Sequence, residues 1–225
     1  MIAAIILAAG RGERMGAKFD KAFLSLGPKP MVAYSLLAFE ACADVEGLVL
    51  VVRRDRIEAA REMCKMFGVS KLLKIVSGGS RRQDSVRAGL AALPPETTIV
   101  TVHDSARPLV TPALISATIA SARKSGSGVA AHKVVDTIKE CGRTGIVSKT
   151  IDRAKLWAVE TPQSFRFDIL RDAYDQVAAA KKTVTDDAGA LEFIGRPVQV
   201  VEWQEPNLKI TYPGDLAVAA ALLKV

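Results

Sequence analysis

The sequence predicts an α/β fold built around a mainly parallel sheet, and three observations support this. Apolar runs of strand length recur along the chain, first at residues 2–9 and again at 47–52. Segments with helix start and stop signals separate these runs. Strands that alternate with helices imply right-handed crossovers and parallel neighbours. The length of 225 residues fits one α/β domain or two small ones.

The elements expected in the first half alternate regularly. Helix starts are predicted by Asp55 with Glu58, by Ser80 with Gln83, and by Thr111 before Pro112. The expected strands span residues 2–9, 47–52, 72–76, 98–102 and 128–131, and the expected helices span 30–43, 55–68, 81–93 and 111–126.

The pattern changes near residue 133. Residues 134–139 and 146–151 are strand-like, and Gly142 and Gly145 lie in the turn between them. An isolated two-stranded hairpin is only marginally stable in water, so this hairpin is expected to pack on something, with another subunit as one candidate. After it we expect strands at 156–159, 198–203 and 208–211, and helices at 166–180, 186–194 and 214–223.

Composition narrows the class of protein. The net charge of +7 suits an anionic ligand, whereas aromatic content of only 5% argues against a stacking surface for nucleic acid. Three cysteines without a C-x-x-C pair favour a reducing cytoplasm, and two histidines cannot form a zinc cluster. The apolar runs are too short to span a membrane, and residues 1–10 lack the basic region of a signal peptide.

A cationic glycine loop follows the first strand and is the strongest functional signal. Neither the dinucleotide loop G-x-G-x-x-G nor the P-loop fits, because both require glycine where Met15 stands. The backbone N–H groups and the cations of this loop still suit a phosphate-rich nucleotide. The alternative is that the loop is a surface turn whose charges are solvated. The residues of this loop are Gly10, Arg11, Gly12, Arg14, Gly16, Lys18 and Lys21.

Two further features follow predicted strands. Residues 78–85, GGSRRQDS, open a helix whose N-terminus can attract an anion. Asp104, in HDSARP, ends another strand and is a natural Mg²⁺ ligand; the alternative is that it only pairs with Arg107 to brace the turn. Because ligands of open α/β sheets bind at the carboxyl ends of strands, these features are expected to converge.

Two isolated cations complete the set. Lys209 lies among apolar residues and could simply point outward from an edge strand, and Arg153 could form a surface pair with Asp152. We find no activated nucleophile in the sequence, so the parts suit phosphoryl or nucleotidyl transfer, which depends on positioning and charge neutralisation.

The motifs occur in a fixed order that resembles one family. LAAGRGERMG, Lys21, GGSRRQDSVRAGL, VHDSARP, VVDTIK, TIDR, LWAVETPQSF, TDDAGALE and NLKIT span essentially the whole chain. Together they resemble the 2-C-methyl-D-erythritol 4-phosphate cytidylyltransferase family of the non-mevalonate isoprenoid pathway. The first motif marks only the wider nucleotidyltransferase family, whereas HDSARP with TIDR and LWAVETPQ is more specific.

The resemblance implies a single-domain Rossmann-like nucleotidyltransferase fold, residues 1–225, with a mixed, mostly parallel sheet flanked by helices and an inserted β-hairpin arm at about 134–153. It implies a cytoplasmic homodimer that uses CTP, Mg²⁺ and methylerythritol phosphate and releases pyrophosphate. The substrate phosphate attacks the α-phosphorus of CTP in line.

The resemblance also implies roles for individual residues. Arg14 and Lys21 would stabilise charge on the triphosphate, Lys209 and Arg153 would position the sugar phosphate, and Asp104 would bind Mg²⁺. The arm would enter the partner's site, so Thr137 and Arg153 would act in trans. The remaining substrate-binding residues are Ala8, Ala9, Gly10, Gly12, Gly79, Ser85, Arg107 and Thr161.

Departures from the family pattern and three competing hypotheses remain. Ser80 and Gly189 stand where the family often has Asp and Ser, and neither is assigned a function. The family usually has Pro-Lys-Gln where this chain has Asp20-Lys21-Ala22, which removes a proline of fixed φ. An alditol-phosphate cytidylyltransferase, such as one acting on ribitol phosphate, shares several motifs, but the TIDR-x-x-LW segment favours the methylerythritol enzyme. Two hypotheses from different functional classes are a nicotinamide-dependent oxidoreductase, whose glycine spacing is missing, and a nucleotide sensor that binds CTP without releasing pyrophosphate.

Overall fold

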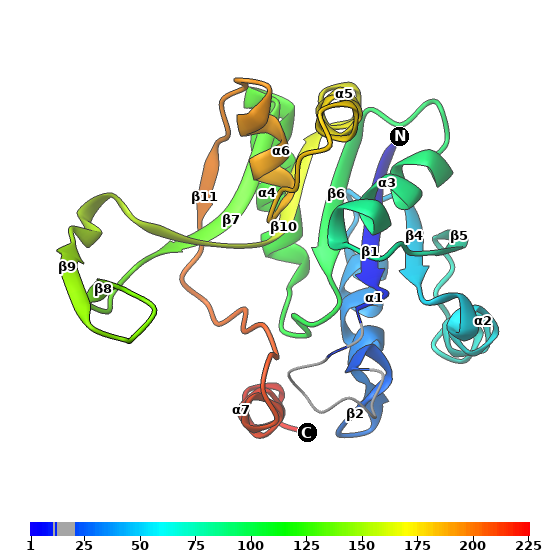
Figure 1. Cartoon of the computed structure of the whole chain (residues 1–225). Helices are drawn as coiled ribbons and strands as arrows, with labels where there is room; N and C mark the ends of the chain where they lie inside the picture. Colours follow the sequence, from blue (N-terminus) through cyan, green and yellow to red (C-terminus); the bar gives the residue numbers. More distant parts are fainter. Residues whose placement is uncertain (11, 13–20) are drawn as a thin grey trace.

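A seven-stranded sheet forms the centre of the protein (Figure 1), seen in a computed structural model that describes residues 1–10, 12 and 21–225. The strand order is β11-β7-β10-β6-β1-β4-β5. β10 runs antiparallel to β6 and β7, and the other neighbours are parallel, so the predicted mixed, mostly parallel sheet is confirmed. The strands are β1 Ile2–Ala8, β4 Gly47–Val52, β5 Leu72–Ser77, β6 Ile99–Asp104, β7 Ser127–Lys133, β10 Trp157–Arg166 and β11 Val200–Glu202.

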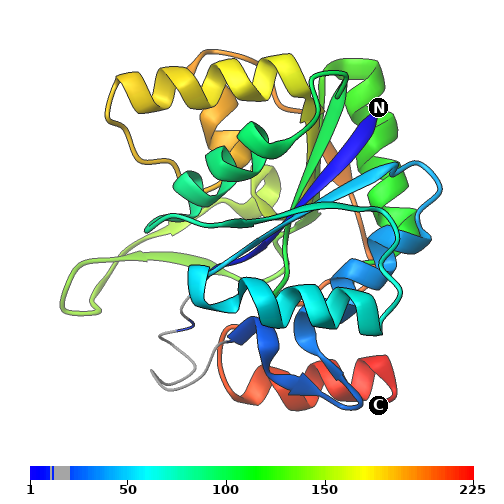
Figure 2. The same ribbon diagram turned by 90° about the vertical axis from the view of Figure 1, so that its right-hand side faces the viewer.

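Helices cover both faces of the sheet, which explains the continuous apolar runs. All seven residues of β1 are buried, and alternate ones join different clusters: Ile6 packs toward α1, α2 and α4, and Ile5 toward α3, α5 and α6. Figure 2 shows α3 and α5 on one side of the sheet and α1 and α2 on the other. The helices are α1 Met31–Ala41, α2 Ile57–Met66, α3 Arg82–Ala92, α4 Pro112–Ser125, α5 Phe167–Ala179 and α6 Asp187–Phe193.

A small layer lies beyond the carboxyl end of β1 (Figure 1). Its elements are the 3₁₀ turn η2 Lys21–Phe23, the short strands β2 Ser25–Leu26 and β3 Lys29–Pro30, and the C-terminal helix α7 Gly214–Leu223. Leu26, Met31, Ile210 and Ala219 form its buried cluster. This layer holds the segment around residue 209 against the end of the sheet.

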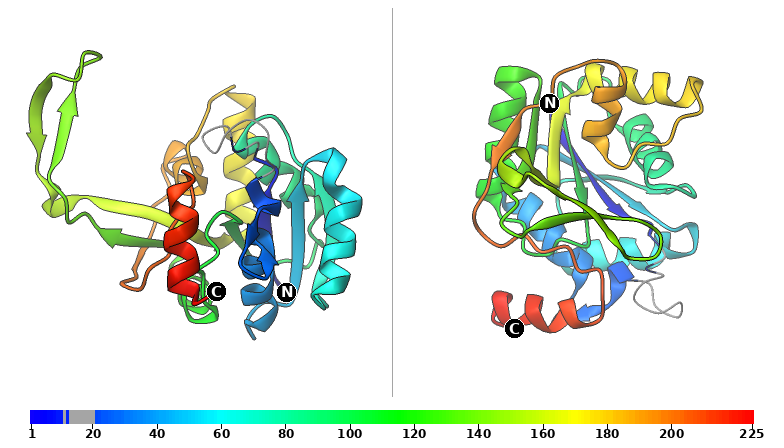
Figure 3. Two further views of the ribbon diagram at one scale, coloured as in Figure 1. Left: turned by 90° about the horizontal axis from the view of Figure 1, so that it is seen from below. Right: turned by 60° about the vertical axis from the view of Figure 1, so that its left-hand side comes forward.

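The predicted hairpin is an arm that projects from the ends of β7 and β10 (Figure 3). It consists of β8 Ile138–Cys141, β9 Val147–Ile151 and the turn η4 Arg153–Lys155, and among the described strands β8 pairs only with β9. Apolar side chains on it are exposed, among them Val135 at 76% and Ile146 at 72%. The hairpin itself is confirmed, and its packing on a second subunit stays a prediction.

Three predicted strands differ from the structure. The first strand of the hairpin, predicted at 134–139, is β8 at Ile138–Cys141, so only residues 138 and 139 agree. Residues 208–211 form no strand. The N–H of Ile210 donates to the carbonyl of Ala106 over 2.8 Å, and this hydrogen bond takes the place of the regular pairing of a strand. Residues 156–159 are only the beginning of β10, which continues to Arg166 because it pairs with both β6 and β7.

Two predicted helix caps are also wrong. Asp55 accepts two hydrogen bonds from the Arg53 side chain and lies in a 3₁₀ turn, η3 Arg54–Arg56, so α2 begins without a side-chain cap. In α3 the N-cap residue is Arg81, whose backbone N–H donates to the carboxylate of Asp84 over 3.1 Å, and Ser80 and Gln83 do not form the predicted capping box. Gln83 is used elsewhere, because its side chain bonds the backbone of Lys182 and Val184.

In the part of the chain that the structure describes, no helix has the length and apolar content needed to cross a membrane.

Candidate active site

A cleft of about 1160 Å³ opens where β1, β4, β5 and β6 end, as expected for a parallel sheet. Segments far apart in the sequence meet there: the loop after β1, the loop before α3, the end of β6 and the stretch before α7. The residues predicted for the site that line this cleft are Ala8, Ala9, Gly10, Gly12, Lys21, Gly79, Ser85, Asp104 and Lys209.

Gly12 lies close to Lys21, the next residue of the glycine loop that the structure describes. Gly12 has φ +64°, and a Cβ placed on it would lie 2.8 Å from Cβ of Lys21. Glycine is therefore required twice at this position, for the left-handed backbone and for the close approach. Arg14, predicted to act beside Lys21, lies outside the described residues, as does Asp20.

The loop before α3 folds back onto the first turn of that helix. The N–H of Gly79 donates to Oγ of Ser85 over 3.2 Å, and a Cβ on Gly79 would lie 2.3 Å from Cβ of Asp84. Asp84 in turn accepts from the backbone N–H of Arg81. Because Gly78 and Gly79 carry no side chain, the backbone of this loop packs closely on its neighbours and lines the cleft, where a nucleotide can approach it.

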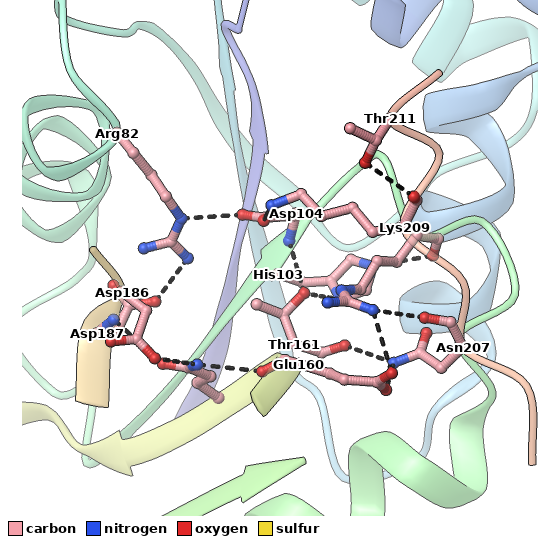
Figure 4. A network of polar contacts seen from close by, with 12 residues as sticks. Arg82, His103, Asp104, Glu160, Thr161, Asp186, Asp187, Asn207, Lys209 and Thr211 are labelled. Carbon is pink, nitrogen blue, oxygen red and sulfur yellow. Dashed lines mark hydrogen bonds and ion pairs between the residues drawn. The ribbon is translucent and has the colours of Figure 1, made fainter. Parts of the chain in front are cut away.

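Asp104 is the central anion of the cleft (Figure 4). Its Oδ1 lies 3.0 Å from Nε of Arg82 and its Oδ2 lies 2.6 Å from Nζ of Lys209. Burial alone would raise the pKa of Asp104, but the charges of Arg82 and Lys209 hold that pKa well below its usual value. Lys209 therefore points inward, and the alternative of an outward lysine on an edge strand is wrong.

Arg82 connects Asp104 to a buried polar group that sequence reasoning missed. Its Nη2 lies 2.7 Å from Oδ2 of Asp187, whose side chain is fully buried, and Oδ1 of Asp187 accepts from the hydroxyl of Tyr174 over 2.6 Å. Burial opposes the charge of Arg82, but Asp187 and Asp104 raise its pKa well above the ordinary value. Asp187 reads in the sequence as a helix N-terminal acid, and no sequence signal pairs it with Arg82.

Arg107 and Thr161 lie behind Asp104 instead of lining the cleft. Arg107 lies 3.3 Å from the carboxylate of Glu160 and donates to the backbone carbonyl of Asn207 over 2.6 Å. The hydroxyl of Thr161 accepts from the N–H of Asp104. The alternative that Asp104 pairs with the side chain of Arg107 is wrong, because Glu160 takes that role.

Arg107 and Asn207 also hold two buried polar atoms, Nε and Oδ1 respectively, that have no partner among the described residues. Asn207 lies two residues before Lys209 and bonds Glu160 and the carbonyl of Thr161. These contacts fix the segment that carries Lys209.

Thr137 and Arg153 lie on the arm, both exposed, and neither lines the cleft of its own chain. Figure 3 shows the arm directed away from the sheet. Arg153 donates to the backbone carbonyl of Val135, and Asp152 caps η4 by accepting from the N–H of Ala154. The surface pair of Arg153 with Asp152 is therefore not formed.

Asp104 is suited to a metal ion that arrives with a nucleotide. The described residues hold no group of three or more metal-binding side chains. Mg²⁺, however, is commonly bound by one or two carboxylates together with substrate phosphates and water. The two ion pairs of Asp104 leave lone pairs free on each carboxylate oxygen, so the donor set fits Mg²⁺ in the presence of a triphosphate.

Comparison with known proteins identifies one family. The family description 2-C-methyl-D-erythritol 4-phosphate cytidylyltransferase matches residues 2–225. The protein of that name from Pelotomaculum thermopropionicum is 46% identical over 99% of this chain and 94% of its own, and that from Geobacillus kaustophilus is 40% identical over 98% and 96%.

Solved structures give the same result. The 4-diphosphocytidyl-2C-methyl-D-erythritol synthase of Anaerococcus prevotii superposes with a TM-score of 0.87 at 30% identity, covering 100% of this chain and 96% of its own. The 2-C-methyl-D-erythritol 4-phosphate cytidylyltransferase of Thermus thermophilus gives 0.82 at 28% identity, covering 98% of both chains. The predicted resemblance is confirmed, and the chain belongs to the 2-C-methyl-D-erythritol 4-phosphate cytidylyltransferase family.

Proposed function

We propose that the cleft transfers CMP from CTP to the phosphate of 2-C-methyl-D-erythritol 4-phosphate and releases pyrophosphate, in the synthesis of isoprenoid precursors. The chain is a nucleotidyltransferase, and the name of its family describes this reaction. The observation that carries the proposal is the Lys209–Asp104–Arg82 arrangement beside the glycine loop and Lys21. It places cations and one carboxylate where a triphosphate and a second phosphate would meet.

The nucleotide is held by backbone and charge. Gly10 and Gly12 would receive the triphosphate, and Gly79 and Ser85, with the backbone of Ala8 and Ala9, would contact ribose and base; all of them line the cleft. Lys21 and Arg14 stabilise the charge that develops on the triphosphate in the transition state. The attacking oxygen belongs to the sugar phosphate, so the protein needs no nucleophile of its own.

The sugar phosphate is positioned by Lys209, Arg107, Thr161, Arg153 and Thr137. Lys209 is paired with Asp104 in the structure, so binding of the phosphate would exchange that partner. Arg107 and Thr161 lie behind Asp104 and would support the site from outside the cleft lining. Arg153 and Thr137 lie on the arm, outside the cleft of their own chain. The protein would therefore act as a homodimer in which each arm completes the partner's site, which also fits the exposed apolar side chains of the arm.

Asp104 would hold Mg²⁺, which neutralises phosphate charge when it is bound with CTP. We place the enzyme in the cytoplasm, because its three cysteines are free thiols, as expected of a reducing compartment.

Pyrophosphate release tests the reaction. Purified protein with CTP and Mg²⁺ is given methylerythritol phosphate or ribitol phosphate, and we expect release only with the former. Lys209→Ala should mainly raise the KM for the sugar phosphate, whereas Lys65→Ala, on the exposed face of α2, should leave both constants unchanged. Release only with ribitol phosphate would overturn the substrate, and CTP binding without release would make the protein a sensor.

Mixing two inactive variants tests the homodimer. In a mixed dimer of Lys21→Ala and Arg153→Ala subunits, an arm that acts in trans leaves one site with both native residues. Unfolding and refolding the mixture should therefore restore activity that neither variant has alone. An arm that acts in its own chain would give no recovery.

A further inference from the structure

We propose that Arg82 is a positioning residue for this reaction: it orients the carboxylate of Asp104, and Asp187 and Tyr174 orient Arg82 in turn. The inference deepens the proposed function and rests on it. It concerns residues to which sequence reasoning assigned no role.

The geometry of one planar group supports this role. Arg82 uses Nε for Asp104, at 3.0 Å, and Nη2 for Asp187, at 2.7 Å. Because the guanidinium is rigid and planar, fixing it on Asp187 also fixes the direction from which it meets Asp104 (Figure 4). A lysine could not serve both carboxylates from a fixed plane.

The far end of this chain of contacts is anchored. Both oxygens of Asp187 are used, one by Arg82 and one by the Tyr174 hydroxyl. The side-chain oxygen of Gln163 accepts from the N–H groups of Asp187 and Ala188, over 3.1 and 3.0 Å, which ties the start of α6 to β10. One series of contacts thus links α5, α6, α3 and β6, through Tyr174, Asp187, Arg82 and Asp104 in that order.

The other contact of Asp104 cannot hold it throughout the reaction. In the proposed function Lys209 leaves Asp104 to receive the sugar phosphate, so Arg82 remains as the cation that holds the carboxylate. Stability alone does not explain the arrangement either, since replacing a buried ion pair with apolar side chains is often neutral or stabilising. The contact between Arg82 and Asp187 is therefore explained by a role in the reaction.

Positioning and simple charge compensation predict opposite results. If Arg82 only neutralised Asp104, its removal would leave the charge of this carboxylate less compensated and would tighten cation binding. If Arg82 positions Asp104, its removal weakens cation binding even though the charge balance favours it. Loss of such a partner typically lowers metal affinity or activity about 10–100-fold.

The experiment measures Mn²⁺ binding by electron paramagnetic resonance to enzyme with methylerythritol phosphate and the α,β-methylene analogue of CTP, which cannot be cleaved, so that the sugar phosphate engages Lys209 and no turnover occurs. We expect Arg82→Met to weaken Mn²⁺ binding about tenfold or more, Arg82→Lys to be intermediate, and Asp187→Asn, which does not line the cleft, to weaken it as well. Arg87→Met, an exposed arginine of the same helix, is the matched control and should leave binding unchanged.

The double variant Arg82→Met with Asp187→Asn leaves no unpaired buried charge, and it replaces the single variant if that one fails to fold. It should bind Mn²⁺ no more weakly than Arg82→Met alone, because both changes break the same contact. Unchanged or tighter Mn²⁺ binding in folded Arg82→Met or in the double variant would overturn the inference. Failure of the wild-type protein to release pyrophosphate would instead overturn the proposed function.

Discussion

The buried hydroxyl of Tyr174 allows the support behind the cleft to be measured. Tyr174 is 1% exposed, and its hydroxyl donates to Oδ1 of Asp187 over 2.6 Å. Burial and the neighbouring Asp187 raise the pKa of Tyr174 well above its ordinary value, so the hydroxyl is a donor throughout the working pH range. Tyr174→Phe removes this donor and keeps the ring that packs in the core.

The magnitude follows from the acceptor. A hydrogen bond to a charged group contributes roughly 1.5–3 kcal/mol to stability. Each kcal/mol shifts the Tm of a domain of this size by about 2–4 °C. Tyr174→Phe should therefore lower Tm by about 3–12 °C.

The assay is differential scanning calorimetry with urea unfolding as a second measure. Tyr212→Phe is the control, because Tyr212 is 58% exposed, and a surface change of this kind should stay within about 0.5 kcal/mol. A Tyr174→Phe variant with the stability of the control would refute the claim that this hydroxyl holds Asp187.

Three further predictions concern the loop before α3, the core and the thiols. Gly79→Ala should weaken CTP binding measured by calorimetry, since its Cβ would meet Asp84 at 2.3 Å, while a loop that simply adjusts would leave affinity unchanged. Burial lowers the pKa of His103 to about 3 in the folded protein, whereas the ordinary value of 6.5 applies to the unfolded chain. The unfolded chain therefore takes up a proton first as the pH falls below about 6.5, and the free energy of unfolding decreases from there down to about pH 3. Urea unfolding should show a loss on the order of 2 kcal/mol between about pH 7.5 and about pH 5, which His103→Gln should reduce; equal pH dependence in both proteins would contradict the assignment. Burial raises the pKa of Cys64 to about 11, and Cys42 is also buried, so a thiol reagent should react quickly with exposed Cys141 alone. Fast reaction that persists in Cys141→Ser would contradict this prediction.

The sheet could be predicted from the sequence because its signal is local. The run at residues 2–8 is apolar on both faces, and the structure buries all of it between two helical layers. The hairpin was predictable for the same reason, from two strand-like runs around Gly142 and Gly145. The features predicted at strand ends do meet in one cleft, since parallel strands end at the same edge.

Long-range partners could not be predicted. Arg82 and Asp187 are 105 residues apart, and the sequence around Asp187 looks like any helix start. Likewise Arg107 pairs with Glu160 instead of its near neighbour Asp104. The missing strand at 208–211 has the same origin, because tertiary contacts of Asn207 and Ile210 replace a ladder there.

The most direct test of the central claim follows oxygen through the reaction. Methylerythritol phosphate labelled with ¹⁸O in its phosphate is given to the wild-type enzyme with CTP, and the products are read by ³¹P nuclear magnetic resonance. Attack of a sugar-phosphate oxygen on the α-phosphorus predicts an isotope shift on both phosphorus signals of the new diphosphate and none on pyrophosphate. A shift on only one of the two diphosphate signals, or label in pyrophosphate, would contradict this account.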